Sequence, residues 1–332
     1  MGSIKGTQHV LHIRCGDDIR DKLVEAGIEG DYLSFADPAW LGPPPAFNAW
    51  LAGRAALIAE RTGLPRQKVR ADLGEAYWRL ARAPADYGHI VLWLEHDLYD
   101  QAALVRVLAS FALRKTLPRI ELICIDRFRG IKRFTGLGQL TPAQLASLWP
   151  KRKRVGRRQL ALGARAWAAL RALTPEPLEV LLKSDLRELP FLKGALQRHL
   201  QELPWTTDGL SLTERQALAA LAKGPRTAGQ LFADAQLKTD PLPFMGDLFF
   251  WSVMRDLIEA PRPPVAVSAA TRRVAWHRRV LRLTPTGRAL LDGKLDWQGQ
   301  QPLARWVGGI PAGPGAPNWR WNPKSRQATR LE

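Results

Sequence analysis

The chain has 332 residues, 46% of them hydrophobic and 24% charged, a composition that excludes a wholly disordered protein. Lys and Arg number 49 against 31 Asp and Glu, which gives a net charge of +18. Two cysteines, Cys15 and Cys124, exclude a disulfide framework and a zinc site built from thiolates alone. Residues 1–9 lack the apolar core of a signal peptide, and the apolar runs are too short for membrane helices. We therefore expect a cytoplasmic protein with no membrane partner.

Strand and helix patterns alternate through the first 150 residues. Short apolar runs predict strands at Val10–Arg14, Tyr32–Phe35, Ile90–Leu94 and Ile120–Ile125. Amphipathic stretches predict helices at 19–26, 46–61, 67–83 and 99–113. Strands that alternate with helices pair in parallel, so the predicted fold class is α/β, with a Rossmann-like parallel-sheet head over residues 1–150.

An acidic residue follows each of the four predicted strands: Asp17 and Asp18, then Asp37, then Glu95 and Asp97, then Asp126. The carboxyl ends of parallel strands share one edge of a sheet, and ligands bind in the crevice there. Together with His96, such acids could hold a divalent cation, bind ligand hydroxyls or act as an acid–base pair. Helix capping is the competing interpretation, because Asp is a preferred N-cap residue.

These positions define the candidate site of the head. The predicted catalytic residues are Asp17, Asp18, Glu95, His96, Asp97 and Gln101. The predicted ligand-binding residues are Gly16, Asp37, Asp126, Gly136 and Gly138. Neither the Rossmann glycine fingerprint nor a P-loop is present, so the cofactor stays open, with a divalent cation as one candidate.

Most of the positive charge lies in the second half of the chain. Residues 1–150 hold 19 basic and 16 acidic side chains, and residues 151–332 hold 30 and 15. Such an excess favours polyanions, although an Arg-rich composition with a solvated surface would give the same count. Two basic segments are candidate nucleic-acid contacts: Lys151, Arg152, Lys153, Arg154, Arg157 and Arg158, and then Arg272, Arg273, Arg278 and Arg279.

Helical patterns follow the head. Residues 151–205 predict a helical connector, with helices at 159–173 and 177–203. Residues 206–296 predict a winged-helix-like domain with helices at 212–223, 227–235 and 244–258 and a basic hairpin between Val265–Val267 and Val280–Leu283. A capping box, Ser211 to Glu214, opens the first helix. The third helix is too apolar to read base edges, so we expect it to be a core element.

The tail, residues 297–332, carries four tryptophans: Trp297, Trp306, Trp319 and Trp321. Side chains of this size are seldom left in water, so we expect the tail to pack on the body of the protein. Base stacking by these indoles is the functional alternative.

Several phrases resemble one bacterial family, the domain-of-unknown-function family 1835. They are Gly16–Asp18, Trp93–Gln101, Arg133–Leu140, Leu189–Leu192, Trp306–Gly309 and Trp319–Trp321. They are spread over most of the chain. The resemblance implies one unit with an α/β head and a helical, winged-helix-like body, and it implies no particular activity, cofactor or catalytic residue.

Two functions follow from these patterns. The charge favours a nucleic-acid-associated binding protein whose head holds a small phosphorylated or nucleotide-like ligand. The acids at the strand ends favour an enzyme, a hydrolase or transferase, that works in the crevice with or without a divalent metal.

Overall fold

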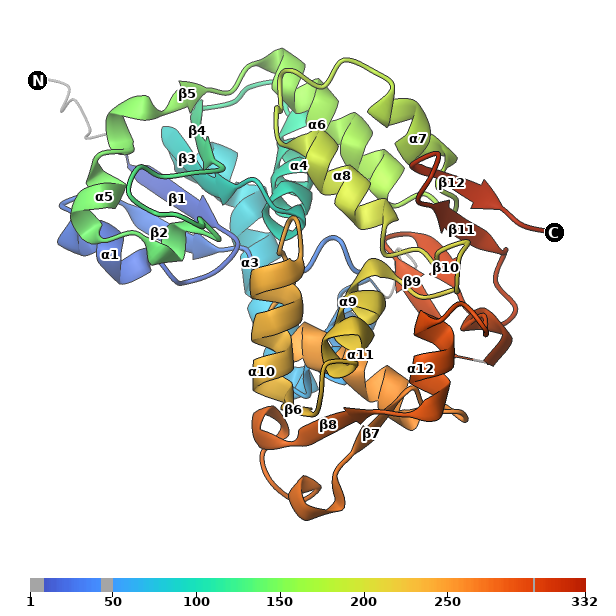
Figure 1. Ribbon diagram of the computed structural model, residues 1–332. Helices are drawn as coiled ribbons and strands as arrows, with labels where there is room; N and C mark the ends of the chain where they lie inside the picture. The colour runs from blue at the N-terminus through green and yellow to red at the C-terminus, as the bar shows by residue number, and fades with distance from the viewer. Residues whose placement is uncertain (1–8, 43–49, 301) are drawn as a thin grey trace, which may run out of the picture. The chain divides into compact units, whose positions relative to one another are not determined.

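The computed structural model describes residues 9–42, 50–300 and 302–332 (Figure 1). The chain divides into two compact units, and each unit combines three separate stretches. Unit 1 comprises Met1–Ala39, Gln67–Ala168 and Ser184–Ala195, and unit 2 comprises Trp40–Arg66, Ala169–Lys183 and Leu196–Glu332. The units are thus interleaved along the sequence, whereas the patterns suggested four consecutive segments.

Unit 1 contains a five-stranded sheet in the order β2-β1-β3-β4-β5. The first four strands are parallel: β1 Val10–Arg14, β2 Asp31–Ser34, β3 His89–Glu95 and β4 Arg119–Ile125. The α/β class is therefore confirmed. A fifth strand, β5 at Lys153–Arg154, runs antiparallel to β4 and was not predicted, because two charged residues carry no hydrophobic period.

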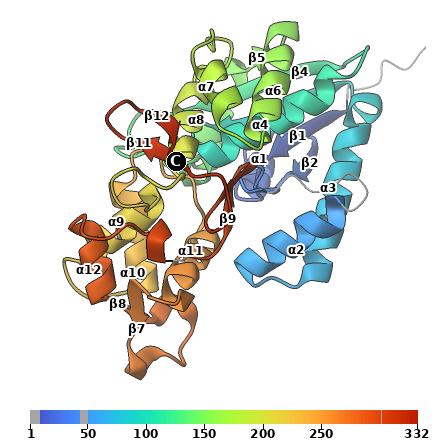
Figure 2. The same ribbon diagram turned by 90° about the vertical axis from the view of Figure 1, so that its right-hand side faces the viewer.

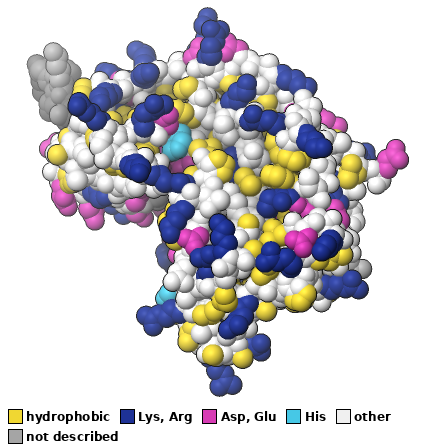
Figure 3. Space-filling view, in the orientation of Figure 1, with side chains coloured by type: hydrophobic (Ala, Val, Ile, Leu, Met, Phe, Trp, Pro, Cys, Tyr) yellow, Lys and Arg dark blue, Asp and Glu magenta, His cyan; other side chains and the backbone are white. Residues whose placement is uncertain are grey.

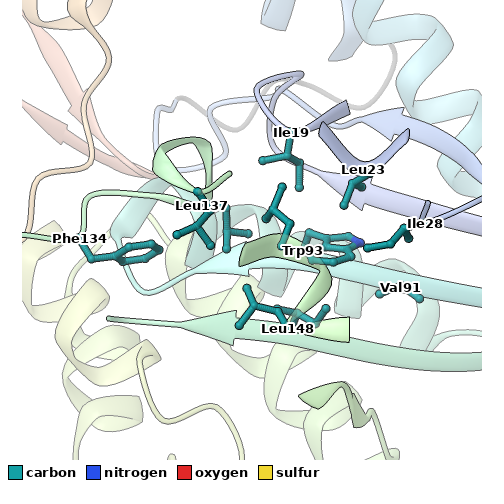
Figure 4. Close-up of a cluster of buried hydrophobic side chains, with 11 residues drawn as sticks. Ile19, Leu23, Ile28, Val91, Trp93, Phe134, Leu137 and Leu148 are labelled. Carbon is teal, nitrogen blue, oxygen red and sulfur yellow. The ribbon is translucent and has the colours of Figure 1, made fainter. Parts of the chain in front are cut away.

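Helices of this unit accompany the sheet, and a hydrophobic core lies between helices and strands. The helices are α1 Arg20–Glu25, α3 Arg66–Asp86, α4 Leu98–Ala112, α5 Pro142–Ala146 and α6 Arg157–Leu170. Strand β3 is buried along its whole length, as a central parallel strand should be. Trp93 and Val91 of β3 contribute to one core cluster with Leu23 of α1 and Leu137 and Leu148 of the segment after β4 (Figure 4).

Unit 2 is mainly helical. Its helices include α2 Trp50–Thr62, α7 Glu176–Leu182, α9 Leu212–Leu221, α10 Ala228–Phe232, α11 Asp247–Glu259 and α12 Pro285–Leu291 (Figure 2). An antiparallel sheet in the order β6-β8-β7 belongs to the same unit and is formed by β6 Arg226–Thr227, β7 Val265–Val267 and β8 Val280–Leu283. The capping box of α9 is confirmed, with Ser211 and Glu214 each accepting the other's backbone N–H.

One predicted helix is wrong. The expected helix over 177–203 is two helices, α7 and α8 Leu192–Leu200, which are separated by an irregular segment. Pro190 lies in this segment and cannot supply the N–H that a helix interior needs. The Asp185 carboxylate also accepts the backbone N–H of Arg187, which offers the chain a turn in place of the helical bond.

The tail forms two short hairpins of unit 2. Strands β9 Arg305–Val307 and β10 Ile310–Ala312 pair, as do β11 Trp319–Asn322 and β12 Gln327–Arg330. Trp297 and Trp321 are buried, and the Trp321 carbonyl accepts the Thr206 N–H at 2.9 Å. Across the described ranges, every helix is too short or too polar to cross a membrane.

Candidate functional site at the strand ends and the neighbouring groove

The carboxylates at the strand ends surround Arg14, the last residue of β1. Its guanidinium is buried, and it donates to Asp100 Oδ1 at 2.9 Å and to Glu95 Oε1. It also donates to both carboxylate oxygens of Asp18, at 2.9 and 3.0 Å. Strands β1 and β3 are neighbours in the centre of the sheet, so Arg14 and Glu95 end side by side at its carboxyl edge.

The start of α4 completes this group. Asp97 is the N-cap of α4 and accepts the Asp100 N–H at 3.1 Å, so the capping interpretation of Asp97 is confirmed. Asp100 accepts the Glu95 N–H at 2.8 Å, and Gln101 donates to the Glu95 carbonyl at 2.6 Å. We call Arg14, Asp18, Glu95, Asp97 and Asp100 the Arg14 cluster.

The loop after β4 closes over the cluster. The Leu137 N–H donates to the Glu95 carboxylate. A Cβ at Gly136 would lie 2.7 Å from a Glu95 oxygen, and a Cβ at Gly138 would lie 2.5 Å from an Asp18 oxygen. The Gly-x-Gly pair is therefore needed for close approach of the backbone to two carboxylates.

Protons compensate for part of the negative charge of the cluster, because one guanidinium binds Asp18, Glu95 and Asp100 while Asp97 lies close to the last two. Burial and the neighbouring Asp100 raise the pKa of Glu95 to about 8. Burial also raises the pKa of Asp97 well above its usual value. Burial alone would lower the pKa of Arg14, but Asp100 and Glu95 outweigh it and raise that pKa, so the guanidinium stays charged.

A pH dependence of stability follows from Glu95. Its pKa is higher in the folded chain than the usual 4.5, so the native state holds the extra proton between about pH 4.5 and pH 8. The free energy of unfolding should fall as pH rises through this window, by about 1.4 kcal/mol for each unit by which folding raises this pKa. Urea unfolding of the native chain and of Glu95→Gln at each pH measures it. The difference between the two should change steadily with pH, because only the native chain loses this proton, and a constant difference would contradict the raised pKa.

The cluster does not fit a divalent cation well. Glu95, Asp97 and Asp100 each place one carboxylate oxygen within 4.8 Å of the others, which is a spacing that a metal ion could use. Arg14, however, already donates to two of these three carboxylates and supplies the positive charge that an ion would bring. We therefore assign no metal to these residues.

The other residues predicted for the crevice bond elsewhere. Asp17 is exposed and pairs with Arg20 at 2.7 Å, and Asp126 pairs with Arg127 at 2.9 Å. Asp37 is buried and accepts the Tyr77 hydroxyl at 2.6 Å. The Gly16 carbonyl accepts the Tyr32 hydroxyl at 2.7 Å, and the half-buried His96 ring lies near the rings of Phe134 and Phe191.

A groove of about 470 Å³ lies beside β4 in unit 1. Strand β4 forms an apolar wall through Leu122–Ile125, and Phe191 adds an aromatic ring. The basic side chains that line it are Lys151, Lys153, Arg154 and Arg187, against one acid, Glu188. We call this hollow the basic groove. The sequence analysis selected three of these cations but missed Arg187 and Phe191, which no local pattern connects to residues 151–154.

The basic run 151–158 divides by role. Arg152 is half-buried, donates to Glu121 at 2.9 Å and lies over the Trp149 ring, so it serves the fold. Arg157 donates to the carbonyls of Arg114 and Lys115. Lys151, Lys153 and Arg154 are exposed, and no ion pair joins them to any residue that the structure describes.

The second basic segment lies on the connection between β7 and β8, which we call the basic hairpin (residues 265–283). Arg272, Arg273 and Arg278 are exposed, and within the described chain no carboxylate pairs with them. Lys and Arg side chains are prominent at this end of unit 2 (Figure 3). Arg279 is different, because its guanidinium lies 5.6 Å from the Trp251 ring centre and it donates to the Val274 carbonyl.

Comparison with known proteins adds no relative. No protein-family model matches the chain, and no curated protein is significantly similar to it. The resemblance to the domain-of-unknown-function family 1835 stays a prediction from the phrases quoted above.

Proposed function

We propose that this chain is a nucleic-acid-associated binding protein whose α/β unit holds a small phosphorylated ligand. The observation that carries the proposal is the placement of exposed cations that lack carboxylate partners among the described residues. Six such cations lie at two places, three in the basic groove (Lys151, Lys153 and Arg154) and three in the basic hairpin (Arg272, Arg273 and Arg278).

The order of elements in unit 2 supports this function. The order of helices α9, α10 and α11 and of the sheet β6-β8-β7 supports a winged-helix plan, in which the connection between β7 and β8 would be the wing. Helix α11 buries Phe250, Trp251, Met254 and Leu257, so it offers few side chains to base edges. We therefore propose contact through the wing to phosphates, which is largely indifferent to sequence.

Replacement of Arg272, Arg273 and Arg278 by Ala tests this function. Each phosphate that the protein no longer neutralises reduces the slope of log affinity against log salt by about 0.9 for duplex DNA. The variant should therefore bind with a slope that is less steep by about 2.7. Filter binding at several salt concentrations measures both slopes.

The matched control is Arg82→Ala, which removes an exposed arginine that is paired with Asp86. This control should leave the slope unchanged, because its charge is already neutralised. Equal slopes for the native chain and the hairpin variant would refute contact through the wing.

An enzyme acting at the strand ends is the second candidate. The raised pKa of Glu95 favours it, because a carboxyl that is protonated near neutral pH can act as a general acid. Glu95 is only 3% exposed, however, and Arg14 and the Leu137 N–H both bind its carboxylate. The geometry therefore supports binding better than catalysis.

A further inference from the structure

We propose that the basic groove is a nucleotide site, with the phosphate on Lys153 and Arg154 and the base against Phe191. The inference rests on the proposed function only for the class of ligand. The sequence patterns predicted that unit 1 binds its ligand in the strand-end crevice. The inference places the ligand in the basic groove instead, whose full set of lining residues those patterns did not predict.

The size and lining of the groove select this class. At about 470 Å³ the groove exceeds what inorganic phosphate needs and lies in the range of small-molecule sites. Its lining combines strand β4 and the half-buried Phe191 with four basic side chains. A ligand that fits it has a flat apolar body and an anionic group, which together describe a nucleotide.

The net positive charge of the groove favours an anionic ligand. Arg187 is neutralised by Asp185, to which it donates at 2.8–3.1 Å. Glu188 lies 3.8 Å from Arg158. In the part of the chain that the structure describes, this leaves Lys151, Lys153 and Arg154 without an ion-pair partner within one hollow.

Helix α6 adds positive potential next to the groove. Its first turn carries no acid and begins with Arg157 and Arg158, although cations near a helix N-terminus are unfavourable. Val155, just before this N-terminus, and Gln159, in the first turn of α6, line the groove. A bound phosphate there would offset part of the helix dipole.

Strand β5 fixes the position of the two central cations. Lys153 pairs in register with Leu122 and Arg154 with Glu121, so their backbone is held by the sheet rather than by a loop. The Val155 N–H extends this ladder by donating to the Ile120 carbonyl at 2.9 Å. The sheet therefore fixes where the backbone presents these two cations beside the groove.

Calorimetric titration of the full chain with adenosine 5′-monophosphate, adenosine and inorganic phosphate tests the site. We expect the monophosphate to bind at least about 10-fold more tightly than adenosine, because charge-assisted hydrogen bonds to the phosphate are the stronger contacts. It should also bind more tightly than inorganic phosphate, because only the nucleotide has a base for Phe191. Equal affinities for the monophosphate and adenosine, or no binding, would overturn the inference.

Two variants locate the site. Joint replacement of Lys153 and Arg154 by Ala should weaken monophosphate binding at least about 10-fold, and Phe191→Leu should weaken it at least about 5-fold. The exchange Lys153→Arg with Arg154→Lys keeps both charges and should retain most of the affinity. Arg82→Ala, with its paired exposed arginine, should bind as the native chain does. Unchanged affinity in the double Ala variant would overturn the assignment.

The two proposals can fail separately. The hairpin variant, with Arg272, Arg273 and Arg278 replaced, should keep full affinity for the monophosphate. If the native chain binds duplex DNA but not the monophosphate, the nucleotide site is wrong and the proposed binding of nucleic acid stands. If it binds the monophosphate but no nucleic acid, the proposed function is wrong and the nucleotide site stands.

Discussion

Replacement of Arg14 by Met should lower the free energy of unfolding by about 3–5 kcal/mol, the range for removing one partner of a buried ion pair. Met fills part of the space of the side chain but leaves the buried Glu95 and Asp100 without their cation. The backbone approach of Gly136 and Gly138 to the cluster should loosen as well, because these carboxylates hold that loop. Urea unfolding followed by tryptophan fluorescence measures the change.

A second substitution separates charge from packing in this experiment. If uncompensated charge causes the destabilisation, Glu95→Gln combined with Arg14→Met should be less destabilised than the sum of the two single variants. A decrease below about 1 kcal/mol for Arg14→Met alone would show that the cluster is not the buried ion network described here.

Replacement of Trp251 by Ala should cost about 3–5 kcal/mol, as is usual for deletion of a buried aromatic side chain. Trp251 lies on the buried face of α11 and is 9% exposed. Its ring stacks on Trp276 of the basic hairpin with ring centres 5.5 Å apart. The substitution should therefore destabilise both α11 and the basic hairpin that packs on it.

The control for this prediction is Trp78→Ala, because Trp78 lies on α3 and is 58% exposed. Its melting temperature should change little, whereas that of Trp251→Ala should fall by several degrees. A melting temperature for Trp251→Ala close to that of the native chain would contradict a core role for α11. It would favour an exposed α11 that reads the major groove of DNA.

The parallel strands of unit 1 were predictable because their centres are apolar. Strand β3 is an example, because His89–Glu95 is buried throughout and its centre is a continuous apolar run that can be recognised in the sequence. Alternation with helices then gave the parallel pairing. The interleaving of the two units was not predictable, because Trp40–Arg66 joins unit 2 through tertiary contacts that leave no local pattern.

The strand-end acids were predicted to meet, but only Asp18, Glu95 and Asp97 lie in the Arg14 cluster. The residue at the centre of the cluster was not selected. In the sequence Arg14 is an ordinary residue at the end of a strand. Only the structure shows that it is buried and bonds to Glu95 and Asp100. One signal was available, because an arginine at the buried end of a central strand must find carboxylates. The basic groove could not be predicted from the sequence, because Phe191 and Arg187 follow Arg154 by more than 30 residues and only the fold brings them together.

The central claim is that the exposed, unpaired cations of this chain bind polyanions. The salt dependence of binding by the native chain to a duplex DNA and a duplex RNA tests it most directly. Three contacts from Arg272, Arg273 and Arg278 of the basic hairpin alone predict a slope of log affinity against log salt of about −2.7 for DNA. Unrelated sequences should give the same slope, because phosphate contacts carry no base code. Absence of measurable affinity for either duplex at low salt would contradict the claim.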